Sequence, residues 1–175
     1  MADITEKKIS YFGAKGKENT EDLAGIVVNR IKEGGITAVA VATTSGGTAL
    51  AFAEAVNGSV PVFGVNFQNS DKLDSDIKEK AEAAGAVFMP DQPVAKYIRE
   101  IPGHSPDSLR CFGQGMKVAV EVIMQAVEVG HIKCGDMVIG VGGTSRGADV
   151  AIVAKAAGGD NLSGLWVSEI LAKPL

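Results

Sequence analysis

The chain has 175 residues, of which 46% are hydrophobic and 22% are charged, and its formal net charge at pH 7 is -4. A chain of this length is typical of a single domain over residues 1–175 and buries roughly 70% of the surface that its unfolded form exposes. The sequence holds no block of basic residues, which argues against a nucleic-acid partner.

Cysteine usage and hydropathy favour a soluble cytoplasmic protein. Cys111 and Cys134 lack the spacing of a metal site or a redox motif, so we expect both thiols to be reduced. The first residues contain no apolar signal segment, and no apolar run is long enough to span a membrane. We therefore expect neither a membrane partner nor a bound metal.

The chain begins with a predicted strand, loop and helix. Residues 8–12 favour a strand, and residues 13–17 form a loop rich in glycine and lysine. Asn19 or Thr20 is suited to cap the helix that follows, which the glycines at 34–35 end.

A loop of hydroxyl residues and glycines follows the apolar run 36–42, which is typical of a strand covered on both faces in a parallel sheet. The helix predicted over residues 49–56 begins directly after this loop. A helix that starts at the carboxyl edge of a parallel sheet offers unpaired N–H groups and a partial positive charge to an anion. The pattern predicts a phosphate site, although the same pattern also turns and caps helices that bind nothing. Its residues are Thr43, Thr44, Ser45, Gly46, Gly47 and Thr48.

The middle of the chain adds two predicted strands and a surface helix. Residues 60–65 favour a strand, and the polar segment 66–70, which begins with Asn66, either contacts a ligand or forms a turn. Residues 74–84 favour a charged helix, and residues 86–89 a short strand.

The segment 90–108 has a weak pattern with four prolines, typical of a lid or an interface. It contains His104, which either binds phosphate, moves a proton or lies on the surface. Residues 109–129 favour the longest helix. This helix is apolar on most sides, so we expect it to be buried and also shared with another subunit in a homo-oligomer. His131 is suited to cap its end.

A second loop of similar chemistry follows the strand predicted over residues 133–141. If both strands lie in one parallel sheet, both loops open on the same edge. The guanidinium of Arg146 would then add a fork that matches phosphate oxygens. The residues of this loop are Gly142, Gly143, Thr144, Ser145, Arg146 and Gly147.

The last part of the chain favours two further strands. Residues 149–156 favour a strand over a helix, and residues 165–171 an edge strand or an interfacial tail. We expect Trp166 to anchor the core or an interface rather than to stack on a ligand.

Several of these segments together resemble the C-terminal domain of pyruvate kinase, and the resemblance covers most of the chain. It rests on Glu18-Asn19-Thr20, the first loop, the Val-Pro-Val strand at 60–62 and the Gly-Asp-Met-Val sequence at 135–138. The resemblance implies a three-layer α/β/α sandwich, with a mostly parallel sheet and an antiparallel edge strand.

The resemblance also implies a ligand site. In that family the first loop holds a phosphate of the sugar bisphosphate effector, which carries over to Thr43, Thr44, Ser45, Gly46 and Thr48, and a late glycine-rich loop borders the effector. Here Thr144, Ser145 and Arg146 replace the proline-rich sequence usual in that late loop. The chain lacks room for the catalytic barrel of about 250 residues, so we expect no pyruvate kinase activity.

We therefore predict a binding protein for a phosphorylated small molecule, with Asn19 and Asn66 beside the two loops. FMN is the preferred ligand, and a sugar phosphate or a nucleotide is the alternative. A second hypothesis is a flavin-dependent or sugar-phosphate-processing enzyme in which His104 or Glu18 transfers a proton. A third is a regulatory subunit that acts on a partner protein.

Overall fold

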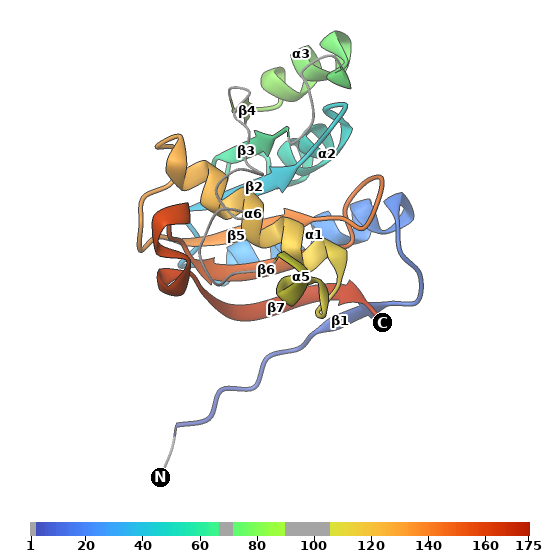
Figure 1. Ribbon diagram of the computed structural model, residues 1–175. Helices are drawn as coiled ribbons and strands as arrows, with labels where there is room; N and C mark the ends of the chain where they lie inside the picture. Colours follow the sequence, from blue (N-terminus) through green and yellow to red (C-terminus); the bar gives the residue numbers. More distant parts are fainter. Residues whose placement is uncertain (1–2, 67–71, 90–105) are drawn as a thin grey trace.

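The computed structural model describes residues 3–66, 72–89 and 106–175 of the chain (Figure 1). The strands in these ranges form one seven-stranded sheet in the order β1-β7-β6-β5-β2-β3-β4. Their bounds are β1 (Ser10–Phe12), β2 (Ala38–Ala42), β3 (Val62–Val65), β4 (Ala86–Phe88), β5 (Met137–Gly142), β6 (Val150–Lys155) and β7 (Trp166–Pro174).

The sheet is mostly parallel, as predicted, but the antiparallel strand is not at its edge. Strand β6 runs antiparallel to both of its neighbours, β5 and β7, and lies inside the sheet. Residues 143–149, which join β5 to β6, are too few for the helical crossover that a parallel neighbour requires, so the chain turns back beside β5. The edge strands β1 and β4 are both parallel to their neighbours.

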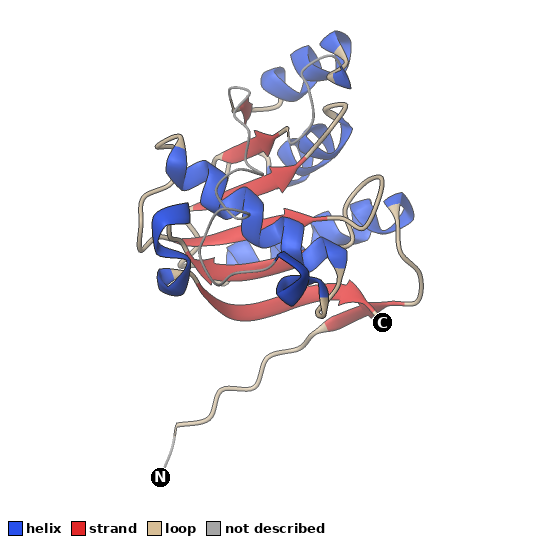
Figure 2. Ribbon diagram, viewed as in Figure 1, coloured by secondary structure: helices blue, strands red, loops and turns tan. Residues whose placement is uncertain are grey.

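Helices cover both faces of the sheet, which confirms the three-layer α/β/α arrangement (Figures 1 and 2). The side chains of β2 alternate between the layers: Ala38 and Ala40 pack in the core cluster of α6, while Val39 and Val41 pack with α1 and α2. None of the described helices is both long and apolar enough to cross a membrane. The helices are α1 (Thr20–Lys32), α2 (Gly47–Val56), α3 (Ser75–Ala83), α5 (Pro106–Arg110) and α6 (Gln114–Glu128), with short 3-10 segments η1 (Lys17–Asn19) and η3 (Gly159–Gly164).

Helix α6 lies directly against the backbone of β5. A Cβ atom on Gly140 would overlap the carbonyl oxygen of Ala119, and one on Gly142 would overlap that of Gly115. The expected burial of this helix is confirmed, but the single helix predicted over residues 109–129 is wrong. Gly113 separates α5 from α6, because its φ of 114° lies outside the helical range. Residues other than glycine rarely adopt this conformation.

Strand β7 is an inner strand only near its end, so the edge strand predicted over residues 165–171 is confirmed for the part of β7 before Ala172, as far as the described residues go. Strand β1 pairs outside it, with Ser10 opposite Ala172. Trp166, the first residue of β7, is 69% exposed, so it does not anchor the core. Four predicted strands begin two or more residues later than expected: β1 at Ser10, β2 at Ala38, β3 at Val62 and β5 at Met137.

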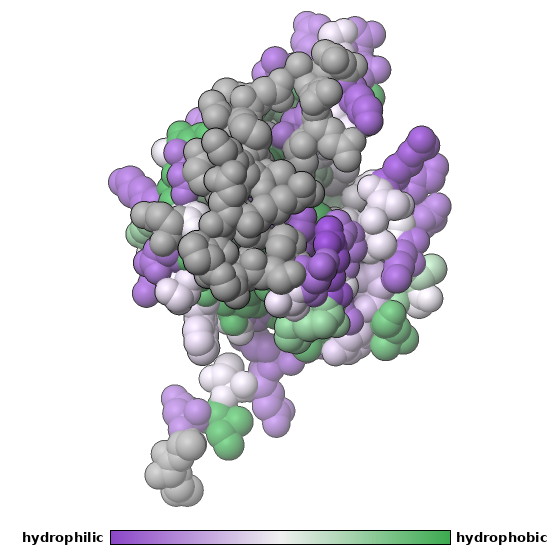
Figure 3. Space-filling view, in the orientation of Figure 1, coloured by the Kyte–Doolittle hydropathy of each residue, from purple (hydrophilic) through white to green (hydrophobic). Residues whose placement is uncertain are grey.

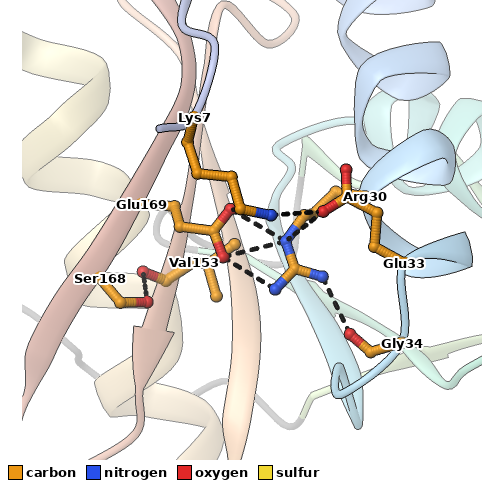
Figure 4. A network of polar contacts seen from close by, with 7 residues as sticks. All are labelled: Lys7, Arg30, Glu33, Gly34, Val153, Ser168 and Glu169. Atoms are coloured by element: carbon orange, nitrogen blue, oxygen red, sulfur yellow. Dashed lines mark hydrogen bonds and ion pairs between the residues drawn. The ribbon is translucent and has the colours of Figure 1, made fainter. Parts of the chain in front are cut away.

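An ion-pair network joins the N-terminal segment, α1 and β7 (Figure 4). Arg30 donates from Nε and Nη2 to the carboxylate of Glu169, at 3.0 and 2.8 Å, and from Nη1 to the carbonyl oxygen of Gly34 at 2.9 Å. Lys7 Nζ lies 2.6 Å from Glu33 Oε2. The hydrogen bond to Glu169 raises the pKa of Arg30, and the hydrogen bond from Lys7 lowers the pKa of Glu33.

Candidate functional site

The first loop is held in shape by its own buried threonine. Thr43 is 5% exposed, its backbone N–H donates to the Val65 carbonyl, and its Oγ1 accepts a hydrogen bond of 3.1 Å from the Gly46 N–H. Gly46 has φ 95°, and a Cβ atom there would lie 3.0 Å from the Ile77 side chain at the start of α3. The positive φ favours glycine at this position, and because Thr43 and Gly46 are both buried, they shape the loop rather than face solvent.

The N-terminus of α2 carries no capping side chain and no acidic residue in its first turn. By contrast, Asp74 caps α3 by accepting hydrogen bonds from the N–H groups of Asp76 and Ile77. The unpaired N–H groups that begin a helix need a partner, and the helix dipole favours a negatively charged one. Thr44 and Ser45 are exposed beside this turn, and Gly47 and Thr48 are half-buried within it.

The second loop opens beside the first. Strands β2 and β5 are parallel neighbours, with Val41 opposite Val141, so the loops that follow them leave the same edge of the sheet side by side. This is the arrangement that the sequence predicts. In the second loop Thr144 is half-buried, whereas Ser145 and Arg146 are exposed.

Packing alone accounts for the three glycines of the second loop. Gly142 lies under α6, and a Cβ atom on Gly143 would overlap the carbonyl oxygen of Gly147. Gly147, at φ 71°, lies so close to η1 that a Cβ atom there would be 2.5 Å from the Lys17 Cα. A ligand role for these glycines stays a prediction.

Asp149 supports the second loop, and the sequence analysis did not single it out as a site residue. Its side chain is fully buried, and its Oδ2 accepts hydrogen bonds from the N–H groups of Gly16, at 3.2 Å, and Thr144, at 3.3 Å. Its Oδ1 lies against the first turn of α6, 2.8 Å from where a Cβ atom on Gly115 would be, and accepts no hydrogen bond from the described residues. The carboxylate thus provides negative charge at the N-terminus of α6.

The start of α1 completes this edge of the sheet. Asn19 occupies the capping position, but its side chain donates to the Ala14 carbonyl at 2.8 Å instead of capping the helix. Thr20 Oγ1 accepts a hydrogen bond of 3.0 Å from the Ala148 N–H. The predicted capping by these side chains is therefore wrong, because both bind neighbouring loops.

The remaining predicted site residues belong to separate parts of the chain. Glu18 is exposed in η1, Asn66 is half-buried after β3, and His104 lies outside the described residues, as do residues 67–70. His131 ends α6: its N–H donates to the Ala126 carbonyl, and its ring stacks on Phe63. Within the described ranges, no three His, Cys, Asp or Glu side chains are grouped so that they could hold a metal.

The sequence matches a known protein family over most of its length. The family model described as "Pyruvate kinase, alpha/beta domain" matches residues 21–154, which include both loops and Asp149. The match covers more than half of the chain and agrees with its mostly parallel α/β sheet. The chain therefore belongs to the family of the pyruvate kinase alpha/beta domain.

Proposed function

We propose that the chain binds the phosphate group of a small molecule between its two loops, and that this molecule is FMN. The observation that carries the proposal is the parallel pairing of β2 with β5, which places residues 43–48 beside residues 142–147 at one edge of the sheet. Arg146 supplies a cation at the same edge as the uncapped N-terminus of α2.

The two loops have different roles in this proposal. The first supplies backbone N–H groups from the first turn of α2 and the exposed hydroxyls of Thr44 and Ser45. In the second loop the Thr144 N–H already donates to Asp149, and the exposed side chains of Ser145 and Arg146 are the groups that we assign to the ligand. Hydrogen bonds to a charged group contribute roughly 1.5–3 kcal/mol each, so four of them give about micromolar binding after the cost of association.

FMN fits this edge because it combines one terminal phosphate with a polar ribityl chain and a flat ring. Asn66 follows β3, the other neighbour of β2, and offers an amide beside the first loop. A sugar phosphate or a nucleotide shares the phosphate chemistry, so the test has to separate these ligands from FMN.

Native mass spectrometry of protein purified without added ligand identifies a retained ligand by its mass. Titration with FMN, a sugar phosphate and inorganic phosphate then compares their affinities. We expect FMN to bind most tightly. Equal affinity for all three would support a phosphate site without FMN selectivity, and no binding of any of them would refute the proposal.

The role of Arg146 is tested by replacing it with alanine. Loss of its charged hydrogen bonds should weaken FMN binding roughly tenfold to a hundredfold. Lys155→Ala is the matched control. This exposed lysine ends β6 and pairs with Met137, the first residue of β5, so it lies at the end of the strands away from the two loops. If Arg146→Ala and Lys155→Ala bind FMN as tightly as the parent does, Arg146 is not the anchor.

Binding without catalysis is the proposal, and it differs measurably from the enzyme hypothesis. Dithionite should bleach the colour of the purified yellow protein. If no candidate oxidant accelerates the return of the colour, the result supports a binding protein. Turnover with an oxidant would identify a flavin-dependent enzyme.

A further inference from the structure

Most of the exposed large apolar side chains of the described residues belong to elements at the β1–β7 end of the sheet. In the part of the chain that the structure describes, six large hydrophobic side chains are exposed, and only Val87 lies on β4, the edge strand farthest from β1. The other five belong to the N-terminal segment, β1, the turn between α5 and α6, and the two ends of β7: Ile4, Tyr11, Phe112, Trp166 and Leu175.

An apolar pocket opens on the same side. It has a volume of about 440 Å³, and it lies between the α5–α6 turn and β7, with Ile9, Phe112, Met116 and Val167 among its lining residues. Glu169 also borders it, but the carboxylate of Glu169 is already bound by Arg30. The pocket therefore suits an apolar occupant rather than a charged one.

Strand β1 leaves the pocket side of β7 open. Among the described residues, β1 pairs with β7 only from Ala172 to Pro174. Val167 and Ile170, which line the pocket, come before this paired region. An unpaired strand edge beside an apolar pocket favours contact with another polypeptide segment.

Residues 3–8, here called the arm, run from β1 away from the body of the molecule (Figures 1 and 3). All of them are exposed, and Ile4 is 80% exposed. The arm begins next to Ile9, which lines the pocket. One chain thus carries both an apolar pocket and, at its margin, an extended segment with an apolar side chain near its outer end.

We propose that two copies of this chain associate through their arms, so that Ile4 of each copy covers the pocket of the other. An antiparallel pair of arms about a two-fold axis between Glu6 and Lys7 is self-complementary. This register places Ile4 opposite Ile9 and Glu6 opposite Lys7, and side chains in directly opposite positions point to the same face. The apolar side chain therefore meets the margin of the pocket, and the acidic side chain meets a basic one.

The mass in solution tests the association. Size-exclusion chromatography with light scattering should give twice the 18.0 kDa of one chain. Ile4→Asp and Phe112→Lys should each shift the mass to that of one chain, whereas Val87→Lys, the exposed apolar control on β4, should leave the dimer intact. Because Ile4 and Phe112 are exposed, the variants should fold. A monomeric parent, or a dimer that only Val87→Lys disrupts, would overturn the proposal.

A mixed disulfide tests the register. Ile4→Cys in one protein and Ile9→Cys in another, both with Cys111→Ser and Cys134→Ser, should form a disulfide between chains when they are mixed and oxidised. Val87→Cys in place of Ile9→Cys is the matched control and should form at most a background amount. If Ile4→Cys couples equally well to both partners, the arms do not pair in this way.

Discussion

A single buried carboxylate supports the edge of the sheet that holds the candidate site. The Oδ2 atom of Asp149 accepts hydrogen bonds from the N–H groups of Gly16, before η1, and Thr144, in the second loop. Its Oδ1 atom lies against α6. The sequence did not reveal this role, because its donors lie 133 and 5 positions away and no short motif connects them. The available signal was an acidic residue directly before the apolar run 150–154.

Removing this carboxylate should destabilise the fold. Asp149→Ala leaves the N–H groups of Gly16 and Thr144 without their acceptor in a buried place, which should cost about 3 kcal/mol in the free energy of unfolding. Asp136→Ala is the control, because Asp136 accepts one exposed N–H group, that of Lys133, and should cost less than about 1 kcal/mol. Urea unfolding measures both variants. Equal losses would show that Asp149 is not a special support.

Among the helices and strands, the sequence predicted the elements whose formation depends on neighbouring residues in the chain. The apolar run at 36–42 predicted a buried strand of a parallel sheet, a second strand was predicted over 133–141, and β2 and β5 are buried parallel neighbours. The break at Gly113 was missed because helical spacing continues across it, from Phe112 to Met116, and a glycine alone does not say whether a helix ends. The inner place of β6 depends on the short connection from β5 and on β7 turning back beside it, and periodicity encodes neither.

The close contact between α6 and β5 gives a prediction about two glycines. Gly140→Ala would push a methyl group into the Ala119 carbonyl and the Ile123 side chain, which should cost about 3 kcal/mol of stability. Gly25→Ala is the matched control: Gly25 is exposed within α1, has no atom within 4 Å of the added carbon, and should raise stability by about 0.5–1 kcal/mol. Denaturation midpoints that fall equally in both variants would contradict the close packing of α6.

At the scale of the whole molecule, the order of the parallel strands made the candidate site predictable. Two loops about one hundred positions apart were expected at one edge because parallel strands share the direction in which they end, and the pairing of Val41 with Val141 agrees. The ligand was not predictable in the same way, since many phosphorylated molecules share the anion that these loops suit. The exposure of Ile4 was not predicted, and the sequence left open whether Trp166 anchors the core or an interface, because exposure depends on how the chain packs as a whole.

The network that joins the arm, α1 and β7 makes stability depend on pH in a defined direction. The hydrogen bond from Lys7 lowers the pKa of Glu33 below its ordinary value of 4.5 in the folded chain. A lowered folded-state pKa means that the unfolded chain binds more protons, so the contribution of Glu33 is fully present above pH 4.5 and is lost as the pH falls through the folded-state pKa. The effect is small because Glu33 is exposed.

Carboxyl NMR titration should give a Glu33 midpoint below 4.5 in the parent. In Lys7→Gln the midpoint should move upward, because the donor that stabilises the carboxylate is gone, whereas an unchanged midpoint would show that Lys7 does not hold Glu33 in solution.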